Sequence, residues 1–305
     1  MDKLLALKMF IQSVDAKGFS SAARQLNLAT SSVTRMIDRL EDDLGTVLLN
    51  RSTRQVTLTD AGTAYYLKSR KILNAMADAD ESVSDRGEMP AGQLRISVPV
   101  AFGQHLIAPH ICALLERYPL LVLDMTLSDD IVDLLGERID LSIRLGSPAA
   151  METVVSRCIG SFRRRVVASA EYLNARGLPE QPMDLTQHEC MCFSYGTPQQ
   201  VWTFTQQGQE IRVPVDGQLK CNNAEVLRDV VLAGCGLALL PDWLVDDDIE
   251  SGRLTSLFDA FVVNPNSASS AISALYLPNH RGSKRINAFI DFLTDLLRSG
   301  SQPVG

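Results

Sequence analysis

The sequence GFSSAARQLNLATSSVTRMIDRLEDDLGTVLLNRSTRQVTLTDAG, residues 18–62, decides the fold of the first part of the chain. Two short segments with helical apolar spacing are separated at Asn27 and Leu28, and a tight return with an arginine on each side follows them. A small helical unit of this design can place one helix in the major groove of DNA while a basic loop reaches the neighbouring phosphates. The stretch therefore indicates a DNA-binding unit.

Two helices are predicted in the first part of the chain, before the third, more polar one. The apolar residues over positions 4–14 predict a first helix that ends at Gly18. Either Ser20 or Ser21 is expected to cap a second helix, whose small apolar residues face inward. Asn27 ends that helix, because an asparagine tolerates the left-handed conformation of a turn.

Thr30 is expected to cap a third helix over residues 31–44, in which apolar side chains recur at helical spacing. Hydroxyl groups and helix-end N–H groups bind phosphate, and an arginine can reach a guanine edge or a phosphate. An ordinary capped surface helix would carry the same residue types, so this helix alone leaves both interpretations open. The residues on its polar side near the start are Thr30, Ser31, Thr34, Arg35 and Asp38.

A hairpin, or wing, is predicted after the third helix. Two short β-prone runs at residues 47–49 and 56–58 enclose a polar segment, with Arg51 and Arg54 on either side of its tip. A solvated hairpin loop is the alternative to a wing that contacts DNA.

A long helix capped by Thr59 and Asp60 is predicted next. It runs for about 28 residues, on the order of 40 Å, before Gly87 and Pro90 end it. Because a helix of this length with a narrow apolar seam rarely stands alone, it indicates a dimer. The seam consists of Ala61, Tyr65, Ile72, Ala75, Ala79 and Val83.

The composition describes a folded protein of roughly two domains. The chain has 305 residues, of which 46% are hydrophobic and 21% charged, which is typical of a well-folded chain. No run of about 18 uncharged apolar residues occurs, which excludes a membrane-spanning helix. The amino end carries Asp2, Lys3 and Lys8 within its apolar pattern and has no small-residue cleavage site. No signal peptide is predicted, so we expect a cytoplasmic protein.

The net charge of −7 is unevenly distributed along the chain. Residues 1–90 hold 12 Lys and Arg and 12 Asp and Glu, so the acidity belongs wholly to the later residues. A neutral domain can still bind DNA when its positive charges gather on one face.

The cysteines are expected to be reduced and buried, because no C-x-x-C pair occurs and no export signal is predicted. Cys190 and Cys192 form a candidate redox pair as the alternative. The four histidines show no ligand spacing with the cysteines, so neither a metal nor another cofactor is expected. The six cysteines are Cys112, Cys158, Cys190, Cys192, Cys221 and Cys235.

Beyond Gly92, strands alternate with helices of about a dozen residues, which predicts an α/β fold with parallel strands. Ligands in such sheets bind at the carboxyl ends of the strands. Strands are predicted over residues 94–98, 121–127, 139–143, 163–169, 202–204, 211–215, 237–240 and 272–277. Helices are predicted over residues 106–117, 131–137, 185–189, 223–233 and 286–297, with a turn over residues 99–104.

The segment quoted first resembles the winged helix-turn-helix of the LysR-type transcriptional regulators, and the later chain agrees with the second half of that family. The resemblance implies an α/β protein with an N-terminal all-α winged helix-turn-helix domain and a two-lobed effector domain like the periplasmic solute-binding proteins. It implies a sequence-specific DNA-binding transcriptional regulator, controlled by a small-molecule effector bound between the two lobes. The matching residues include Phe10, Ala22, Ala23, Leu26, Ser32, Val33, Ile37, Leu40, Glu41, Gly45, Leu48, Leu49, Thr57, Leu58 and Gly62.

The same resemblance implies a division of the chain and a set of partners. A DNA-binding domain is expected over residues 1–58, a dimerisation helix over 59–89 and an effector-binding domain over 90–305. Lobe I would comprise residues 92–161 and 266–299, and lobe II residues 162–265. The expected partners are double-stranded promoter or operator DNA, an anionic or aromatic small molecule, and further copies of this chain in a homodimer or homotetramer. RNA polymerase is a further candidate partner, and no membrane partner is expected.

Carried over residue by residue, the resemblance implies DNA contacts from the third helix and from the wing. The chain departs from the family at Thr30-Ser31, where members often have Gln-Pro or Gln-Ser. The candidate DNA-binding residues are Ser20, Thr30, Ser31, Ser32, Thr34, Arg35, Arg39, Arg51 and Arg54.

The effector site is expected at the strand ends. Family members commonly hold an effector carboxylate with a Ser or Thr just after the first strand, where this chain has Ala101. Asn222 and Asn223 can bind a polar ligand or simply cap a helix. Aromatic residues, Trp202 among them, can wall a cleft or pack in the core. The candidate effector-binding residues are Ser97, Pro99, Val100, Ala101, Phe102, Ser128, Asp129, Arg144, Phe193, Asn222 and Asn223.

Two other functions stay open. One is a regulator that binds DNA without responding to an effector, and the other is a cytoplasmic binding protein or enzyme with a helical amino domain. Catalysis is not predicted, because the chain has no G-x-S-x-G motif, no phosphate loop and no convergent carboxylate pair. The segment Gly234-Cys235-Gly236 lacks the third glycine of a dinucleotide-binding loop, so it is interpreted as a turn between a helix and a strand.

Overall fold

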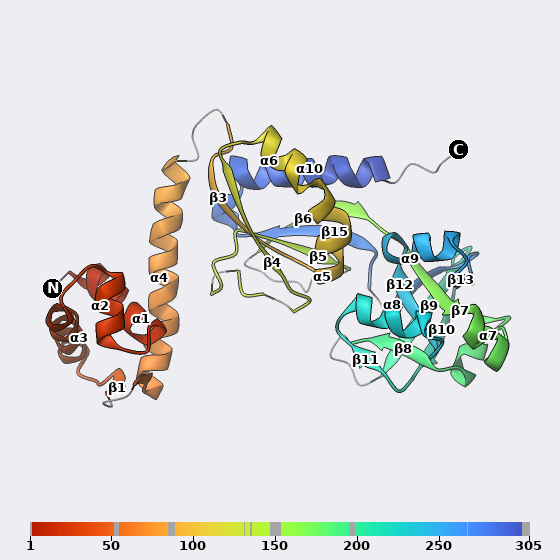
Figure 1. Ribbon diagram of the computed structural model, residues 1–305, viewed down its shortest axis with the longest axis horizontal. Helices are drawn as coiled ribbons and strands as arrows, with labels where there is room; N and C mark the ends of the chain where they lie inside the picture. The colour runs from red at the N-terminus through yellow and green to blue at the C-terminus, as the bar shows by residue number, and fades with distance from the viewer. Residues whose placement is uncertain are drawn as a thin grey trace. The chain divides into compact units, whose positions relative to one another are not determined.

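The computed structural model describes residues 2–51, 55–84, 89–130, 132–134, 136–146, 154–194, 199–266 and 268–300. The side chains of Arg51 and of residues 77–84 and 299–300 are not described. The chain divides into two compact units, Met1–Arg86 with Leu135–Arg138, and Gly87–Leu134 with Ile139–Gly305 (Figure 1).

The first unit is a small helical domain with a two-stranded wing. Its core is formed by apolar side chains from the first three helices and from the wing, with Phe10, Ile37 and Leu48 among the most deeply buried. In order, its elements are α1 (Lys3–Asp15), α2 (Phe19–Gln25), α3 (Thr30–Leu44), β1 (Leu49–Arg51), β2 (Val56–Leu58) and α4 (Asp60–Ser84).

The starts of α2 and α3 differ from the sequence-based expectation. Gly18 and Ala29 occupy the two N-cap positions, and neither has a side-chain capping bond. Thr30 is the first helical residue of α3, because the N–H groups of Ser32 and Val33 already donate to the carbonyl of Ala29. The predicted caps at Thr30 and at Ser20 or Ser21 are therefore wrong.

Other local predictions in this unit are confirmed. Asn27 has a φ of 54°, which is the left-handed turn expected of it. The hydroxyl oxygen of Thr59 accepts a hydrogen bond from the N–H of Gly62 at 2.9 Å and so caps α4. Gly62 is required because a Cβ there would collide with the carbonyl oxygen of Leu48. The start of α4 thereby packs closely against the wing.

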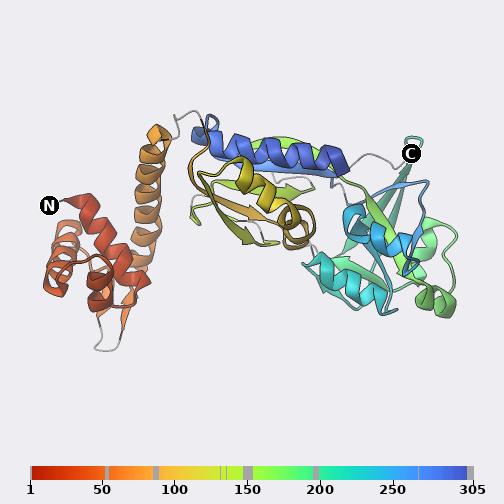
Figure 2. The same ribbon diagram turned by 45° about the horizontal axis from the view of Figure 1, so that its top comes forward.

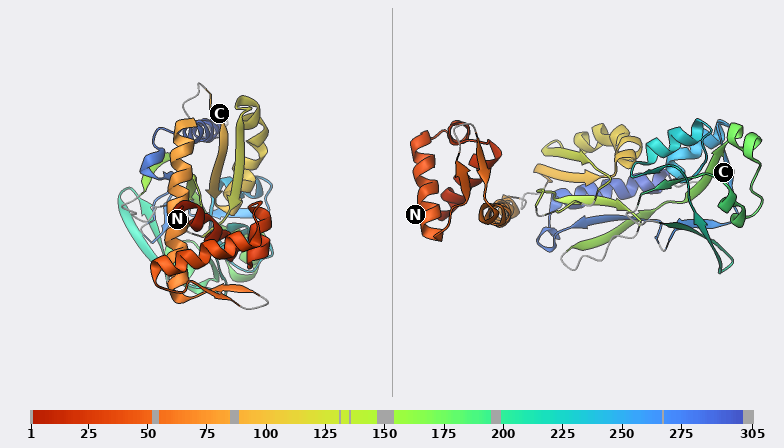
Figure 3. Two further views of the ribbon diagram at one scale, coloured as in Figure 1. Left: turned by 90° about the vertical axis from the view of Figure 1, so that its left-hand side faces the viewer. Right: turned by 90° about the horizontal axis from the view of Figure 1, so that it is seen from below.

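The main chain at the start of the wing is held to α3 by a side-chain carboxylate. Its strands pair antiparallel, with Leu49 opposite Leu58. One carboxylate oxygen of Glu41 in α3 accepts hydrogen bonds from the N–H groups of Leu48 and Leu49, at 2.7 and 3.0 Å. In the left view of Figure 3 the two strands of the wing lie along the lower edge of the first unit. The predicted hairpin is confirmed, while Arg54 at its tip lies outside the described residues.

The second unit consists of two lobes, each built on a five-stranded sheet. Lobe I has the strand order β4-β3-β5-β15-β6. β3 pairs parallel with β4 and β5, whereas β15 runs antiparallel to both of its neighbours. The sheet is therefore mixed, since the chain returns from the other lobe in the opposite direction. Its strands are β3 (Gly92–Val98), β4 (Leu121–Leu127), β5 (Leu141–Leu145), β6 (Val155–Ser161) and β15 (Ala271–Tyr276).

One face of the lobe I sheet is covered by two helices, α6 (Ile111–Arg117) and α10 (Lys284–Gly300). Figure 2 shows α10 lying along the sheet. Because alternate strand residues face opposite sides, Ile96 and Ile143 pack under these helices while Ser142 faces the other way.

Three predicted elements of lobe I differ in the structure. The expected turn over residues 99–104 is helical, as α5 (Val100–Phe102) followed by the π-helical segment Gly103–Ile107. The helix expected over residues 106–117 is interrupted by a 3-10 turn with Pro109, which has no N–H to donate. Residues 132–134 and 136–137, the described part of the helix expected over residues 131–137, are not helical.

Lobe II contains a second five-stranded sheet in the order β11-β8-β12-β7-β13 and a three-stranded antiparallel sheet in the order β10-β9-β14. Sequence analysis found only part of it. Its strands are β7 (Arg164–Ser169), β8 (Cys190–Phe193), β9 (Gln200–Gln206), β10 (Gln209–Val215), β11 (Lys220–Cys221), β12 (Leu237–Pro241), β13 (Leu254–Leu257) and β14 (Val262–Pro265). Its helices are α7 (Ala170–Arg176), η3 (Pro182–Gln187), α8 (Ala224–Leu232) and α9 (Asp242–Glu250).

Lobe II is layered, with the five-stranded sheet in the middle. On β7, Val166 and Ala168 pack toward the three-stranded sheet, whereas Val167 packs toward α8 and α9. Trp202 of β9 is buried between the two sheets and is a core residue.

The chain passes between the lobes twice, first at residues 162–163 and again after β14. Within the ranges given above, no helix is long and apolar enough to cross a membrane.

Candidate functional site

The outer face of α3 is polar and exposed. Its inner face buries Val33, Ile37 and Leu40 completely, so the remaining residues are turned outward by the helical repeat. The candidate DNA-binding residues exposed in this part of the first unit are Ser20, Thr30, Ser31, Ser32, Arg35 and Arg39.

Thr34 differs from the other candidates of α3. It is half-buried, and its hydroxyl donates a hydrogen bond of 3.0 Å to the carbonyl of Thr30. This hydroxyl is thus engaged by the helix itself. Arg51 is the last residue of β1, and its side chain is not described.

A polar contact joins α1 to α4 within the first unit. The hydroxyl of Tyr66 donates to the carboxylate of Asp15 at 2.5 Å, and Arg70 donates to the same hydroxyl at 3.0 Å. Burial raises the pKa of Tyr66, and the neighbouring Asp15 raises it further. Tyr65 packs its ring 5.7 Å from that of Phe10. These contacts fix the start of α4 on the helical core.

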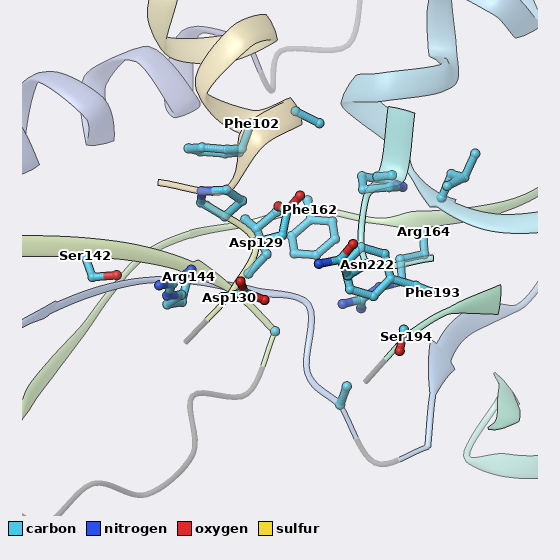
Figure 4. A pocket seen from close by; sticks show the side chains of 18 of the residues that line it. Phe102, Asp129, Asp130, Ser142, Arg144, Phe162, Arg164, Phe193, Ser194 and Asn222 are labelled. Carbon is cyan, nitrogen blue, oxygen red and sulfur yellow. The ribbon is translucent and has the colours of Figure 1, made fainter. Parts of the chain in front are cut away.

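The second unit contains a cavity of about 550 Å³ lined by both lobes (Figure 4). This volume lies within the range of small-molecule sites in proteins. Most of its wall is apolar. Of the candidate effector-binding residues, those that line it are Pro99, Ala101, Phe102, Asp129, Arg144, Phe193 and Asn222.

Four candidates do not line the cavity. Ser97 is buried in the lobe I sheet. Val100 contributes a main-chain hydrogen bond, in which its N–H donates to Asp129 at 3.1 Å. The carbonyl of Ser128 accepts from Arg144 at 3.1 Å. Asn223 caps α8 through the N–H of Val226, as expected, and its amide donates to Asp129 at 3.1 Å.

Asp129 therefore links the two lobes at the edge of the cavity. Its two carboxylate oxygens accept from Val100 in lobe I and from Asn223 in lobe II. A second contact joins His105 of the π-helical segment to Glu225 of α8. Both contacts reach the first turn of α8, which lies directly beside the lining residue Asn222.

Sequence analysis missed several lining residues that come from strands and from the crossing between the lobes. Ser142 of β5 is 1% exposed, and its hydroxyl has no hydrogen-bond partner among the described residues. An unsatisfied buried hydroxyl costs about 1–3 kcal/mol, and because Ser142 also lines the cavity, a ligand there can satisfy its hydroxyl. The hydroxyl of Ser97 also has no partner among the described residues, but Ser97 does not line the cavity. Arg144 lies two residues beyond Ser142 on the same face of β5.

Arg164 of β7 is a second missed residue. Its Nη1 atom donates to the side chains of Asn264 and Ser270 and to the carbonyl of Ser269, at 2.6, 3.2 and 3.2 Å. Its guanidinium carbon lies 4.6 Å from the ring centroid of Phe162. These contacts hold Arg164 in the cavity wall. Its neighbour Arg165 instead forms salt bridges with Asp246 and Asp259.

The cysteines are unpaired, and only some are buried. Burial raises the pKa of Cys190 to about 12 and that of Cys192 to about 11. Thiols with such values are poor nucleophiles at neutral pH, which weighs against a redox pair. Cys112, Cys158 and Cys235 are exposed, so the expectation that the cysteines are buried is wrong for these three.

Two family models match the chain, one for each unit. The model described as "Bacterial regulatory helix-turn-helix protein, lysR family" matches residues 4–63. The model described as "LysR substrate binding domain" matches residues 87–298.

Curated relatives match over nearly the whole chain. The HTH-type transcriptional regulator CrgA of Neisseria meningitidis serogroup C is 34% identical over 292 residues, covering 95% of this chain and 96% of that protein. The HTH-type transcriptional activator AaeR of Escherichia coli K12 is 30% identical over 295 residues, covering 97% and 94%.

Solved structures give the same match. The structure of CrgA, a LysR-type transcriptional regulator from Neisseria meningitidis, has a TM-score of 0.59 and 33% identity, covering 96% of this chain and 98% of that chain. The full-length structure of the Vibrio cholerae virulence activator AphB has a TM-score of 0.61 and 28% identity, with the same coverage.

Proposed function

The chain belongs to the LysR family of bacterial transcriptional regulators, and we propose that the exposed face of α3 and the wing carry its DNA contacts. It is a DNA-binding regulator with a second domain that takes a small-molecule effector. We assign the DNA-binding domain to residues 1–58, the dimerisation helix to 59–89 and the effector-binding domain to 90–305.

The observation that carries the proposed DNA face is the exposure of Ser31, Ser32, Arg35 and Arg39 on a helix whose other side is fully buried. Such a helix enters the major groove with its amino-terminal residues toward the bases. Arg35 suits a guanine edge or a phosphate, and the hydroxyls suit phosphates. We propose Arg51 and Arg54 as wing contacts on the strength of the family resemblance. Thr34 is a weaker candidate, because its hydroxyl is engaged within the helix.

The test is binding to the DNA upstream of the protein's own gene, measured by fluorescence anisotropy. Arg35→Ala and Arg54→Ala should each weaken binding by about 10- to 100-fold, since a good side-chain contact to a base contributes about 1–3 kcal/mol. Arg212→Ala, an exposed arginine of β10, is the matched control and should bind like the wild type. Full affinity in both α3 and wing variants would refute the assignment.

We propose that α4 joins two copies of the chain. Its amino end packs on the core of its own unit through Tyr65, so this part of the predicted seam has an intramolecular role. Further along, Ile72 and Met76 lie one turn apart and are 52% and 41% exposed. Large apolar side chains exposed together on one helix favour a second helix as partner.

The oligomeric state tests this role of α4. Ile72→Glu should lower the molecular mass in sedimentation equilibrium and weaken binding to a two-half-site DNA. Lys71→Glu, at an exposed neighbouring position, should leave the mass unchanged. An Ile72→Glu protein that keeps the wild-type mass would contradict the proposal.

We propose that the effector binds in the cavity of the second unit. The cavity is supported as the site by its volume and by its walls, which come from both lobes. A ligand that binds one arrangement of the lobes more tightly than another shifts the population between them. An anionic or aromatic molecule suits the arginine and phenylalanine side chains of the wall.

The alternative is a regulator that does not respond to an effector. Unchanged DNA affinity and melting temperature across a panel of metabolites would favour it. We also place the protein in the cytoplasm, where a bacterial regulator meets chromosomal DNA, and keep RNA polymerase as a proposed partner.

A further inference from the structure

We propose that the cavity of the second unit takes a small dicarboxylate, an organic acid with a carboxylate at each end of a short apolar body. One carboxylate lies at Ser142 and Arg144 of lobe I, and the other at Arg164 of lobe II. This inference rests on the proposed function, in which the same cavity binds the effector.

The lobe I end of the cavity offers an unused hydroxyl beside a guanidinium. Ser142 is almost fully buried, and its hydroxyl has no partner among the described residues, although it lines the cavity. Figure 4 shows this hydroxyl on the side toward Arg144. A carboxylate oxygen would accept the hydroxyl proton and, at the same time, lie next to a cation. An apolar group at this position would leave the hydroxyl unsatisfied.

The lobe II end offers a second, immobilised guanidinium. The Nη1 atom of Arg164 donates to Asn264, Ser269 and Ser270, and all three acceptor oxygens are neutral. They orient the guanidinium in the wall of the cavity. The ring of Phe162 supports it from one face at 4.6 Å. Such a fixed fork matches the two oxygens of a carboxylate.

The space between these ends is apolar. Figure 4 shows Arg144 and Arg164 on different sides of Phe162, which belongs to the crossing between the lobes. Phe102, Phe193 and the β12 residues Leu239 and Leu240 also line the cavity. Two cationic ends and an apolar middle describe a molecule with an acid at both ends.

Two aspartates also line the cavity and must be reconciled with a dianion. Both oxygens of Asp129 already accept hydrogen bonds, from Val100 and from Asn223. Asp130 is exposed, so water screens its charge. Replacing it with the neutral amide in Asp130→Asn removes this screened negative charge and should tighten dicarboxylate binding only slightly.

The experiment measures acid binding to the full-length chain by isothermal titration calorimetry in the absence of DNA. The probes are succinate, glutarate, adipate and terephthalate, each paired with a monocarboxylate of the same body. At the best chain length, the diacid should bind at least about 10-fold more tightly than its monoacid partner, because a second charge-assisted contact is added. Equal affinities of diacid and monoacid at every length would overturn the proposal, and this comparison needs no variant.

Variants then assign the two ends. Ser142→Ala should weaken diacid binding by about 10-fold, and Arg164→Gln should bring the diacid to the affinity of the monoacid. The matched controls are Ser97→Ala, the buried cross-strand neighbour of Ser142 that does not line the cavity, and Arg163→Gln, the exposed neighbour of Arg164. Both controls should bind like the wild type. Equal loss in a variant and its control would overturn the assignment of that end.

The two proposals fail in different ways. If no diacid binds while DNA binding depends on Arg35, the dicarboxylate is wrong and the DNA face stands. If diacids bind as expected but leave DNA affinity unchanged, the ligand class stands and the proposed regulation is wrong.

Discussion

The outer face of α3 and the cavity of the second unit both present serine and arginine side chains, which are exposed on α3 and enclosed in the cavity. On α3, Ser31 and Arg35 are exposed, and the helix alone decides where they point. In the cavity, Ser142 is buried and Arg164 is held by residues about one hundred positions away in the sequence. A site on a helix surface can thus be recognised from local spacing, whereas an enclosed site depends on tertiary contacts.

The difference also concerns preorganisation. An exposed arginine keeps its rotamer freedom until it meets a phosphate or base, and loses up to about 2 kcal/mol of that freedom on binding. Arg164 has already lost most of this freedom in the folded protein, through its three hydrogen bonds and the ring of Phe162. We therefore expect small-molecule recognition to be geometrically stricter than the contacts of the DNA face.

The largest expected effect is a loss of DNA binding by the first unit that leaves acid binding by the second unit intact. Gly62→Ala places a methyl group against the carbonyl oxygen of Leu48 and should destabilise the first unit by about 3 kcal/mol. DNA binding should fall, while acid binding by the second unit is retained. Calorimetric unfolding and titration measure the two. Gly18→Ser, where a side chain has open space, should be neutral or slightly stabilising. Loss of both functions in Gly62→Ala would show that the units do not fold independently.

The next largest effect is a difference in the free energy of unfolding between Arg→Lys replacements in the cavity and on α3. Arg164→Lys removes the planar fork, its hydrogen bonds and its packing on Phe162, and should lower the free energy of unfolding by about 1–2 kcal/mol. Arg35→Lys should leave it unchanged, because Arg35 is exposed. Urea unfolding checks both. Equal losses of stability in the two variants would contradict the prediction that the contacts of Arg164 stabilise the fold and those of Arg35 do not.

A smaller effect is expected from the serines. Ser142→Ala removes a buried hydroxyl that has no partner among the described residues, so the ligand-free protein should be as stable as the wild type or up to about 1 kcal/mol more stable. Ser31→Ala should change stability by less than about 0.5 kcal/mol, as is usual at the surface. A clear destabilisation by Ser142→Ala would reveal a structural partner for the hydroxyl.

The cysteines show the same contrast between exposed and enclosed groups, and we expect it to change their reaction with a thiol reagent but not the stability of the protein at neutral pH. With a pKa of about 12, only about one Cys190 in ten thousand is a thiolate at pH 8. Iodoacetamide at pH 8 should therefore modify the exposed Cys112, Cys158 and Cys235 and spare Cys190 and Cys192 until the protein is unfolded. Mass spectrometry of the peptides checks this.

The sign of the accompanying pH effect follows from these raised pKa values. Folding favours the neutral thiols of Cys190 and Cys192, so their contribution to stability is fully present below the ordinary cysteine pKa of about 8.5. It is lost as the pH rises toward 11 and 12. A melting temperature that rises between pH 9 and 11 in the wild type, relative to a Cys190→Ala, Cys192→Ala variant, would contradict this sign.

The sequence predicted the first unit better than the second because local signals are sufficient there. Asn27, Thr59 and the β1–β2 hairpin all act over a few residues. In the second unit, α8 and eight strands were anticipated, but β6, β8, β11, β13 and β14 were not. The antiparallel course of β15 depends on the route of the chain between the lobes. A strand residue such as Ser142 gives no local sign that its hydroxyl faces a cavity. Arg164 lies between two other arginines in the sequence, and only the fold shows that Arg164 lines the cavity while Arg165 pairs with Asp246.

The place of β15 in the lobe I sheet has a consequence for how the protein is made. β15 lies between β5 and β6, yet it is synthesised after the whole of lobe II. On the ribosome, β6 has no partner strand in that sheet until residue 276 has emerged, whereas lobe II is one continuous segment that can fold first. A nascent chain cut short before β15 should therefore present a finished lobe II beside an open sheet edge, which chaperones recognise and other strands can join.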